Sequence, residues 1–166
     1  MLRLYDIEDT IKTVSDAIAS VMNMQVIICD TDRRRVGDSN KEWGPEELTL
    51  SPNSVLAGIM ASGTPLVLSD RESNASCMTC EYRSNCAVKA SVGIPIKYGS
   101  TVLGGIEIIA DTESNREILL EKTGYILNFM NKMAELIVSK LLERDAAHKL
   151  NIIREQLIAI MDSIDD

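Results

Sequence analysis

Histidine and aromatic residues are scarce in this sequence of 166 residues, which has one histidine, one tryptophan and one phenylalanine. With His148 as the only imidazole, no Ser-His-Asp or Cys-His arrangement has independent support. The sequence also lacks the G-x-x-x-x-G-K-[ST] phosphate loop, a G-x-G-x-x-G turn after a strand and a G-x-S-x-G elbow. Its acidic residues are scattered, and no carboxylate pair stands out for acid–base chemistry. These absences predict a protein that is not an enzyme.

Positively charged residues are also fewer than negatively charged ones. The sequence has 17 Lys and Arg and 25 Asp and Glu, which gives a net charge of −8. Binding a phosphate backbone needs clustered basic residues, so we expect no direct contact of this fragment with nucleic acid. The basic run Arg33–Arg35 is flanked by aspartates and is interpreted as a hairpin face. No apolar run approaches the roughly 20 residues of a membrane span, and the N-terminus has no signal-peptide pattern. We therefore expect a cytoplasmic protein without a membrane partner.

Hydrophobic spacing predicts an α+β order along the chain. A helix is expected over residues 7–22 with Asp6 as its N-cap, followed by strands at 24–30 and 35–37 and a polar loop over 39–52. A short helix at 53–61 and a strand at 66–68 precede a polar insertion over 70–90. Strands at 92–97 and 102–110 then form a hairpin around Tyr98-Gly99-Ser100. The fold class is α+β, with a mainly antiparallel sheet whose flanking helices lie on one side.

The C-terminal third predicts one long helix, which begins at the capping box Ser114-x-x-Glu117 and reaches about residue 164. Its apolar stripe runs through Ile126, Met130, Met133, Ile137 and Leu141, then slips and resumes at Leu150, Ile153, Leu157 and Ile160. The polar residues 143–149 between the two stretches are a weak point, where a register change is plausible. The helix either folds back on its own domain or forms a two-chain coiled coil or bundle with the first helix. We favour the second interpretation, and thus a homodimer through the terminal helices, because an exposed seam of this length would leave an apolar patch in water.

Three of the four cysteines fall within ten positions, as Cys77-x-x-Cys80-x-x-x-x-x-Cys86. Two thiolates separated by two residues can bind one metal from a tight turn, and a third can close around it. We therefore predict metal ligands, for zinc or an iron–sulfur cluster. A thiol redox switch is a weaker alternative, and disulfides are disfavoured in a reducing compartment. A third alternative, that the cysteines are incidental small apolar residues, fits so polar a segment poorly.

The fourth ligand of such a site is open. Cys29 is a candidate metal ligand, although it lies in a buried-strand pattern where a free cysteine is commonly a small core residue. His148 lies deep in the last helix and is interpreted as facing solvent. A carboxylate, a water or an incoming small molecule could also fill the position. Arg83 either lowers the thiol pKa values or is an exposed loop arginine.

Several stretches resemble the N-terminal GAF-like sensor domain of sigma-54-dependent transcriptional activators. They are Ser62–Val67, the cysteine motif with Arg83, Gly93–Ile96 with Gly99, Val102–Ile106, and Met133–Ile137 with Lys140. In that family a PAS domain, an ATPase domain and a DNA-binding helix-turn-helix follow the sensor. The resemblance thus implies a GAF-like sensor domain over 1–142 and a coiled-coil linker helix over 143–166 that leads to a downstream PAS-like domain.

The function that we expect is a sensory input domain of a bacterial transcriptional regulator. It would sense redox state, metal or a small ligand through the cysteine cluster, with Cys77, Cys80 and Cys86 binding the cofactor, or in a pocket over the sheet. The long helix of a dimer would carry the signal onward. One alternative is a zinc-stapled dimerisation module without sensing. A second is a thiol-based sulfoxide reductase, since GAF domains that resemble free methionine sulfoxide reductase use cysteines for catalysis.

Overall fold

The computed structural model describes residues 2–39, 49–81 and 83–165. Five antiparallel strands form one sheet in the spatial order β2-β1-β5-β4-β3. The strands are β1 (Gln25–Asp30), β2 (Arg35–Asp38), β3 (Leu66–Leu68), β4 (Ala90–Tyr98) and β5 (Thr101–Ala110). The α+β class with an antiparallel sheet is therefore confirmed, and each strand lies within two residues of its predicted bounds.

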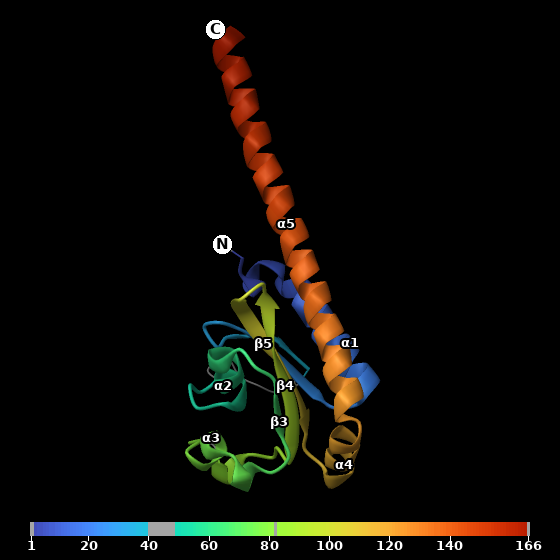
Figure 1. Cartoon of the computed structure of the whole chain (residues 1–166). Coiled ribbons are helices and arrows are strands. Elements are labelled where there is room, and N and C mark those ends of the chain that lie inside the picture. Colours follow the sequence, from blue (N-terminus) through green and yellow to red (C-terminus); the bar gives the residue numbers. More distant parts are fainter. Residues whose placement is uncertain (1, 40–48, 82, 166) are drawn as a thin grey trace.

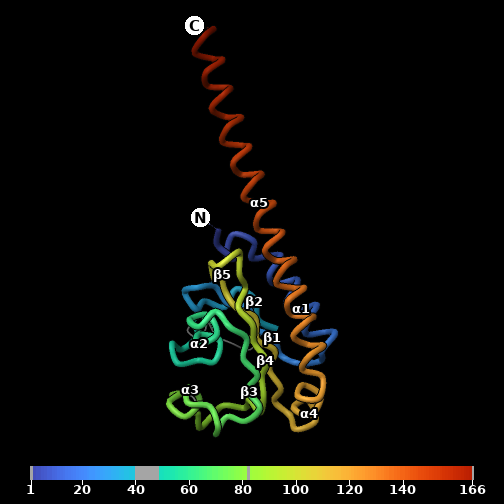
Figure 2. Tube along the Cα trace, in the orientation of Figure 1, coloured from blue at the N-terminus to red at the C-terminus, as the bar shows by residue number. Residues whose placement is uncertain are grey.

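The two terminal helices cover one face of this sheet (Figures 1 and 2). Helix α1 (Glu8–Met22) packs on β1 and β2, and helix α5 (Thr123–Asp165) packs on β4. Strand alternation directs one set of aliphatic side chains toward these helices, where they form the larger core. This core includes Ile28, Val92, Ile94, Ile106 and Ile108, all fully buried.

The opposite face carries the short helices α2 (Val55–Ser62) and α3 (Ala75–Met78). Helix α2 lies so close to the sheet that a Cβ at Gly93 would meet Ile59 and one at Gly105 would meet Leu56. A smaller core forms beneath it, from Ile27, Cys29, Leu50, Leu56, Ile59 and Ile109. The sequence pattern predicted helices on one side of the sheet, whereas the structure has a second, thinner layer.

Both predicted helix starts differ in the structure. A 3-10 turn, η1 (Leu4–Ile7), precedes α1, and Asp6 pairs with Arg3 at 3.3 Å instead of capping the helix. The prediction of a capping box at Ser114 and Glu117 is wrong, because helix α4 (Glu113–Glu121) begins one residue before Ser114. Its N-cap is Thr112, whose hydroxyl accepts a hydrogen bond from the Asn115 N–H at 3.1 Å.

The predicted single helix over 114–164 is divided at Lys122 into α4 and α5. The first part of its predicted seam turns inward, since Ile126, Met130, Ile137 and Leu141 are buried against the chain's own sheet. For these residues the helix packs on its own domain, so they are not a coiled-coil seam. The remainder of α5 continues beyond the sheet (Figure 1), and the residues from Ala146 to Asp165 are all exposed.

Candidate functional site

The three clustered cysteines lie on one short segment below α2, on the face of the sheet opposite α1 and α5. Cys77 is in α3, where the Asn74 side chain caps the helix by accepting the Cys77 N–H at 3.2 Å. The Cys80 N–H donates to the Cys77 carbonyl at 3.3 Å, and Cys86 follows the 3-10 turn η4 (Arg83–Asn85). All three thiols are free and half-buried. We call residues 75–86 the cysteine loop.

An arginine that sequence reasoning missed, Arg71, binds the C-terminal end of this loop. It lies in the 3-10 turn η3 (Arg71–Ser73), and its Nη1 donates to the Cys86 carbonyl at 2.6 Å and to the Arg83 carbonyl at 3.5 Å. Arg83 itself is exposed. The structure therefore supports the reading of Arg83 as a loop arginine and assigns the role beside the thiols to Arg71. No spacing in the sequence distinguishes Arg71 from other surface arginines.

Cys80 and Cys86 lie close enough to Cys77 to affect the pKa of its thiol. Burial raises the pKa of the Cys77 thiol, and the nearby Cys86, Cys80 and Glu107 raise this pKa further, while Arg71 lowers it. A thiol with a raised pKa is a poor nucleophile at neutral pH, because the thiolate is the reactive form. A metal ion bound there would have to displace the proton of the Cys77 thiol, because the thiolate is also the form that binds a metal.

Cys29, the fourth predicted ligand, lies in a different place. It is fully buried on β1 beneath α2, with its Sγ 3.7 Å from the Met60 Sδ. Burial raises its pKa, and the charges that raise it further belong to Glu107 and Asp30. Its surroundings are those of a small core residue.

A buried carboxyl lies on the same face of the sheet. Glu107, on β5, pairs with Ile27 and Gly93 on the neighbouring strands and is 7% exposed. Burial raises its pKa to about 7, against the opposing effects of the Ser91 hydroxyl and Arg35. Arg35 forms an ion pair with Asp38 at 2.5 Å. The signal for Glu107 was a lone charge in the apolar run of residues 102–110, which the sequence analysis passed over.

Ser91 adds a second polar group to this face. Its Oγ is buried, and within the described part of the chain no acceptor or donor meets it in hydrogen-bonding geometry, although the hydroxyl lies close enough to lower the pKa of Glu107. Buried polar atoms normally have a partner. The pair Glu107 and Ser91 therefore offers polar groups that a bound molecule could satisfy.

The structure does not test the metal prediction. Among the described residues, no three His, Cys, Asp or Glu side chains are already gathered closely enough to hold an ion. His148 is exposed on the part of α5 that passes η1, where Leu2, Arg3, Asp6 and Arg144 lie beside it. Zinc or an iron–sulfur cluster at Cys77, Cys80 and Cys86 remains a prediction.

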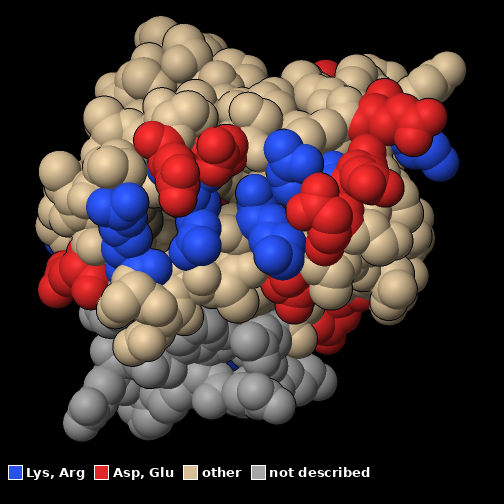
Figure 3. Space-filling model, turned by 90° about the horizontal axis from the view of Figure 1, so that it is seen from below, with Lys and Arg blue, Asp and Glu red and all other residues tan. Residues whose placement is uncertain are grey.

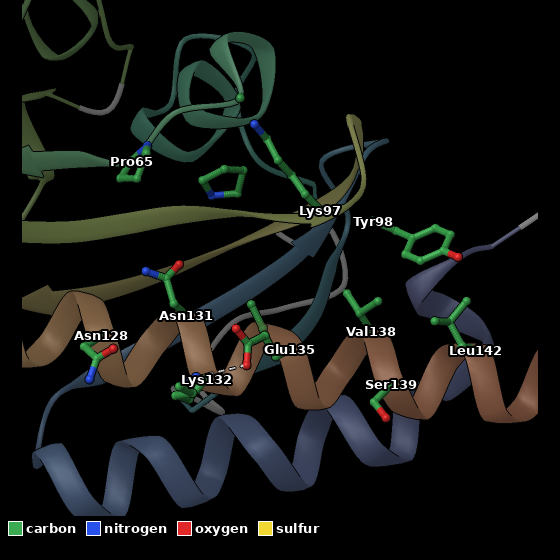
Figure 4. Close-up of a pocket in the computed structure, with 13 residues that line it drawn as sticks. Pro65, Lys97, Tyr98, Asn128, Asn131, Lys132, Glu135, Val138, Ser139 and Leu142 are labelled. Carbon is green, nitrogen blue, oxygen red and sulfur yellow. Dashed lines mark hydrogen bonds and ion pairs between the residues drawn. The ribbon is translucent and has the colours of Figure 1, made fainter.

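A separate open groove of about 730 Å³ runs along α5 beside the ends of β3 and β4. Figure 4 shows Asn128, Asn131 and Glu135 on the helix side, and Lys97 reaching toward the turn after α2. Lys132 and Glu135 pair with each other at 3.4 Å. No residue of the cysteine loop lines this groove.

Charges of both signs lie on one face of the molecule (Figure 3). On the face in Figure 3, Lys and Arg side chains are interspersed with Asp and Glu, so this face has no continuous basic patch. No helix in residues 2–39, 49–81 or 83–165 combines the length and hydropathy needed to cross a membrane.

A known regulatory protein is similar in sequence to most of this chain. The chain is 28% identical over 141 residues to an Escherichia coli (strain K12) protein named as a uric acid sigma-54-dependent transcriptional regulator, UacR. The match covers 84% of this chain, which spans about a quarter of that relative's length (24%).

Solved structures share the fold at low identity. The nlh2 GAF domain of A. aeolicus in an inactive state has a TM-score of 0.53 and 17% identity, over 78% of this chain and 85% of that one. The type II free methionine-R-sulfoxide reductase of Thermoplasma acidophilum has a TM-score of 0.55 and 12% identity, over 81% and 94% of the two chains. These likenesses concern the fold alone.

The family itself follows from a match to a family model over most of the chain. Residues 6–139 match the family described as the GAF domain, which extends from the turn before α1 to the domain-facing part of α5. The resemblance inferred from the sequence is thereby confirmed, while the cysteine spacing is not tested by these matches. The chain belongs to the GAF domain family.

Proposed function

We propose that this chain is the sensory input domain of a cytoplasmic transcriptional regulator of the sigma-54-dependent kind, and that Cys77, Cys80 and Cys86 form its sensing site. The proposal is carried by one observation: three free, half-buried thiols lie on one short loop, with Cys80 and Cys86 close enough to Cys77 to raise its pKa. Zinc or an iron–sulfur cluster bound there would supply positive charge, and for the cluster also redox sensitivity. The similarity to UacR supports the regulatory role.

The cysteine loop is connected to the helices that would carry a signal. Just before the loop, the Ser69 carbonyl accepts a hydrogen bond at 3.1 Å from Nε of Arg116 on α4. Just after it, the Lys89 N–H donates to the Ala110 carbonyl at the end of β5, and the chain continues directly into β4. Helix α4 leads into α5, and α5 packs on β4. A change in loop conformation would therefore reach α5 by two short routes.

The test is metal and sulfide analysis with a visible spectrum on protein purified without oxygen. The wild type is compared with Cys80→Ser and with Cys29→Ala. Iron with sulfide, or about one zinc per chain, that is lost in Cys80→Ser but kept in Cys29→Ala supports a site on the loop. Loss of metal in both variants would add Cys29 to the ligands, and a wild type without metal would contradict the proposal.

A second candidate function is the binding of a small polar ligand at Glu107 and Ser91 on the same face. It is favoured by the buried Ser91 hydroxyl and by the carboxyl beside it. The relative UacR is named for uric acid, a planar molecule that presents N–H donors and carbonyl acceptors. We propose that uric acid or a related oxopurine would donate to Glu107 and accept from Ser91.

This candidate is tested by calorimetric titration of the chain with urate. Binding by the wild type, weakened in Glu107→Gln and in Ser91→Ala while both variants keep their thermal unfolding transition, would support it. Binding that neither substitution changes would place the ligand elsewhere, and no binding would contradict the proposal.

We propose no catalytic role. The likeness to the sulfoxide reductase concerns the fold at 12% identity, and the raised pKa of Cys77 disfavours that residue as a thiolate nucleophile. Turnover of methionine sulfoxide with a thiol reductant would contradict this view. Tightly bound zinc that no signal affects would instead favour the alternative of a dimerisation module in which the metal only stabilises the loop.

A further inference from the structure

Strand β4 has a neighbouring strand along only part of its outer side. Strand β3 pairs with residues 91–93 of β4, and no other strand of the described residues lies beside β4 there. The pairing ends because the chain enters β3 through Gly63, whose φ of 68° ends α2, and through Pro65, which has no N–H. Residues 94–98 of β4 therefore have no strand on this side, and we call them the free edge.

The backbone of the free edge presents hydrogen-bonding groups to the open side. Pro95 cannot donate to a ladder, and a proline in a sheet lies where its nitrogen faces away from the neighbouring strand. Backbone groups alternate in direction along an antiparallel strand, and the irregularity between Ile96 and Lys97 puts its extra residue in β5. Lys97 therefore directs its N–H and C=O outward, to the side that the Pro95 nitrogen faces. Ile96 and Tyr98 instead face β5.

The free edge lies in the open groove of about 730 Å³ along α5. Figure 4 shows α5 on one side of the strand, and Pro65 and the Lys97 amine on the other. The volume of the groove is within the range of about 300–1,000 Å³ that is usual for ligand sites. Successive side chains of an extended chain point in opposite directions. A strand laid along the free edge would therefore send one side chain toward α5 and the next toward Lys97.

The wall that α5 forms suits apolar side chains. Val138 and Leu142 line it and are half-buried. Asn131 presents an amide that can both donate to and accept from a peptide backbone. The charges that α5 adds to the groove, on Lys132 and Glu135, pair with each other at 3.4 Å. This wall therefore has little preference for the charge of an occupant.

The opposite wall presents a positive charge. The Lys97 side chain lies so close to Gly63 that a Cβ there would be 3.1 Å from the Lys97 Nζ. Lys97 is exposed, and within the part of the chain that the structure describes it has no carboxylate partner. An ammonium group in this position favours an anion, and a carboxylate would form a charge-assisted hydrogen bond with it.

We propose that the free edge binds an extended peptide of a partner protein, which adds a strand to β4 and places an acidic side chain on Lys97. The peptide backbone would accept from the Lys97 N–H and donate to the carbonyls of Pro95 and Lys97. The residues before and after the acidic one would point toward Val138 and Leu142. The preferred peptide therefore alternates acidic and apolar residues. This interaction is separate from the sensing site and goes beyond the proposed function.

The same residues disfavour a second copy of this chain at the free edge. Prolines and lysines on an edge strand are common means of preventing pairing between identical edges. In an antiparallel pair of two free edges, both copies of Pro95 would lack a donor, and both Lys97 amines would lie on one face and repel each other. An acidic peptide instead turns the charge of Lys97 into an attraction.

Fluorescence anisotropy of labelled peptides tests the charge preference on the full chain. The peptide Val-Glu-Val-Glu-Val should bind, and Val-Lys-Val-Lys-Val should not. Lys97→Ala should weaken binding of the acidic peptide about tenfold, because it removes a charge-assisted hydrogen bond. Lys122→Ala, a matched change of an exposed lysine outside the groove, should leave binding unchanged. Absence of binding by the wild type, or equal losses in the two variants, would overturn the proposal.

Backbone methylation of the peptide tests the addition of a strand. In an added strand every second peptide N–H faces β4, so a single N-methyl group moved along the acidic peptide should weaken binding at alternate positions. The side chains and the net charge stay the same throughout this series. If no position, or every position to the same extent, weakened binding, the peptide would be held by its side chains alone and strand addition would be refuted.

Amide hydrogen exchange tests the open edge itself. In the free chain the Lys97 N–H should exchange faster than those of Ile96 and Tyr98, and the acidic peptide should slow the exchange of Lys97. A Lys97 N–H that is already protected in dilute protein would mean that the edge is closed. Protection that grows with protein concentration in the absence of peptide would assign the edge to a second copy. Either result would overturn the proposed occupant.

Discussion

At the scale of single residues, the sheet tolerates a carboxyl at Glu107 only at an electrostatic cost. Burial makes the charged form unfavourable, and the partial compensation by Ser91 and Arg35 leaves the pKa near 7. Because the unfolded chain releases this proton near pH 4.5, folded and unfolded states bind different numbers of protons between pH 4.5 and about 7. In this window the folded state holds the proton, and stability falls as the pH rises.

We expect the free energy of unfolding to show this slope. Between pH 4.5 and 7.5 the Glu107 contribution should decrease by about 3 kcal/mol, the difference between the two pKa values times 1.36 kcal/mol. Glu107→Gln imitates the protonated form and should remove that part of the slope. The measurement is urea denaturation at several pH values for both proteins, and parallel pH profiles would show that Glu107 is not the cause.

Two glycines should respond in opposite ways to alanine. A Cβ at Gly104 would lie 2.2 Å from the Cys29 carbonyl oxygen and 2.4 Å from Leu4 Cδ1, so Gly104→Ala should cost about 1–3 kcal/mol. Gly58 is exposed in α2 with open space around its Cα, and Gly58→Ala should stabilise by about 0.5–1 kcal/mol. Denaturant midpoints of the two variants would check this, and equal shifts would be unexpected.

At the level of residues, sequence prediction depends on spacing. The cysteine motif was visible because Cys77 and Cys80 are separated by two residues, and the structure places the three cysteines on one loop, while their role as ligands stays a prediction. Arg71 and Glu107 were missed since their roles depend on residues from β5, β4 and the loop meeting across the fold. The placement of Cys29 beneath α2 likewise follows from tertiary packing.

At the scale of elements, two residues compete for the role of N-cap of α4: Thr112, which caps the helix in the structure, and Ser114, which the sequence suggested. Thr112→Ala removes the hydroxyl that accepts the Asn115 N–H and should cost about 1 kcal/mol. Ser114→Ala, which changes a residue inside the helix, should alter stability by no more than about 0.5 kcal/mol. Thermal unfolding of both variants distinguishes them, and a larger loss in Ser114→Ala would restore the capping box that the sequence suggested.

The helices and strands were largely predictable because hydrophobic periodicity reports burial directly. Periodicity could not say which stripe of α5 meets the sheet and which stays exposed, since both have helical spacing. It also gave no sign of the break at Lys122, where no proline or glycine ends the helix.

At the scale of the whole molecule, the first part of α5 packs on the sheet and the last part extends beyond it (Figure 1). Leu141, Arg144 and Asn151 still lie beside η1, with Leu2, Arg3 and Asp6 lining the same hollow. Beyond Asn151 every described residue is exposed. The structure thus keeps the helix in contact with the domain for about two turns beyond residue 142.

A chain that ends at Asn151 should therefore retain the stability of the domain and lose only the part of its self-association that residues 152–165 carry. We expect its unfolding transition to depend less on protein concentration than that of the full chain. Calorimetry over a range of concentrations checks both. A shortened chain that unfolds at a markedly lower temperature even when both proteins are dilute would mean that the distal helix also stabilises the domain.

The uninterrupted backbone of α5 fixes a rotational relation between the sheet and anything attached beyond it. Each residue turns an α-helix by about 100°, so adding or removing one residue in the exposed part would swing an attached domain through more than a quarter of a circle. Seven residues restore nearly the same direction. Chimeras that join this domain to a foreign output domain should therefore be active when their linker lengths differ by seven residues, and inactive at intermediate lengths.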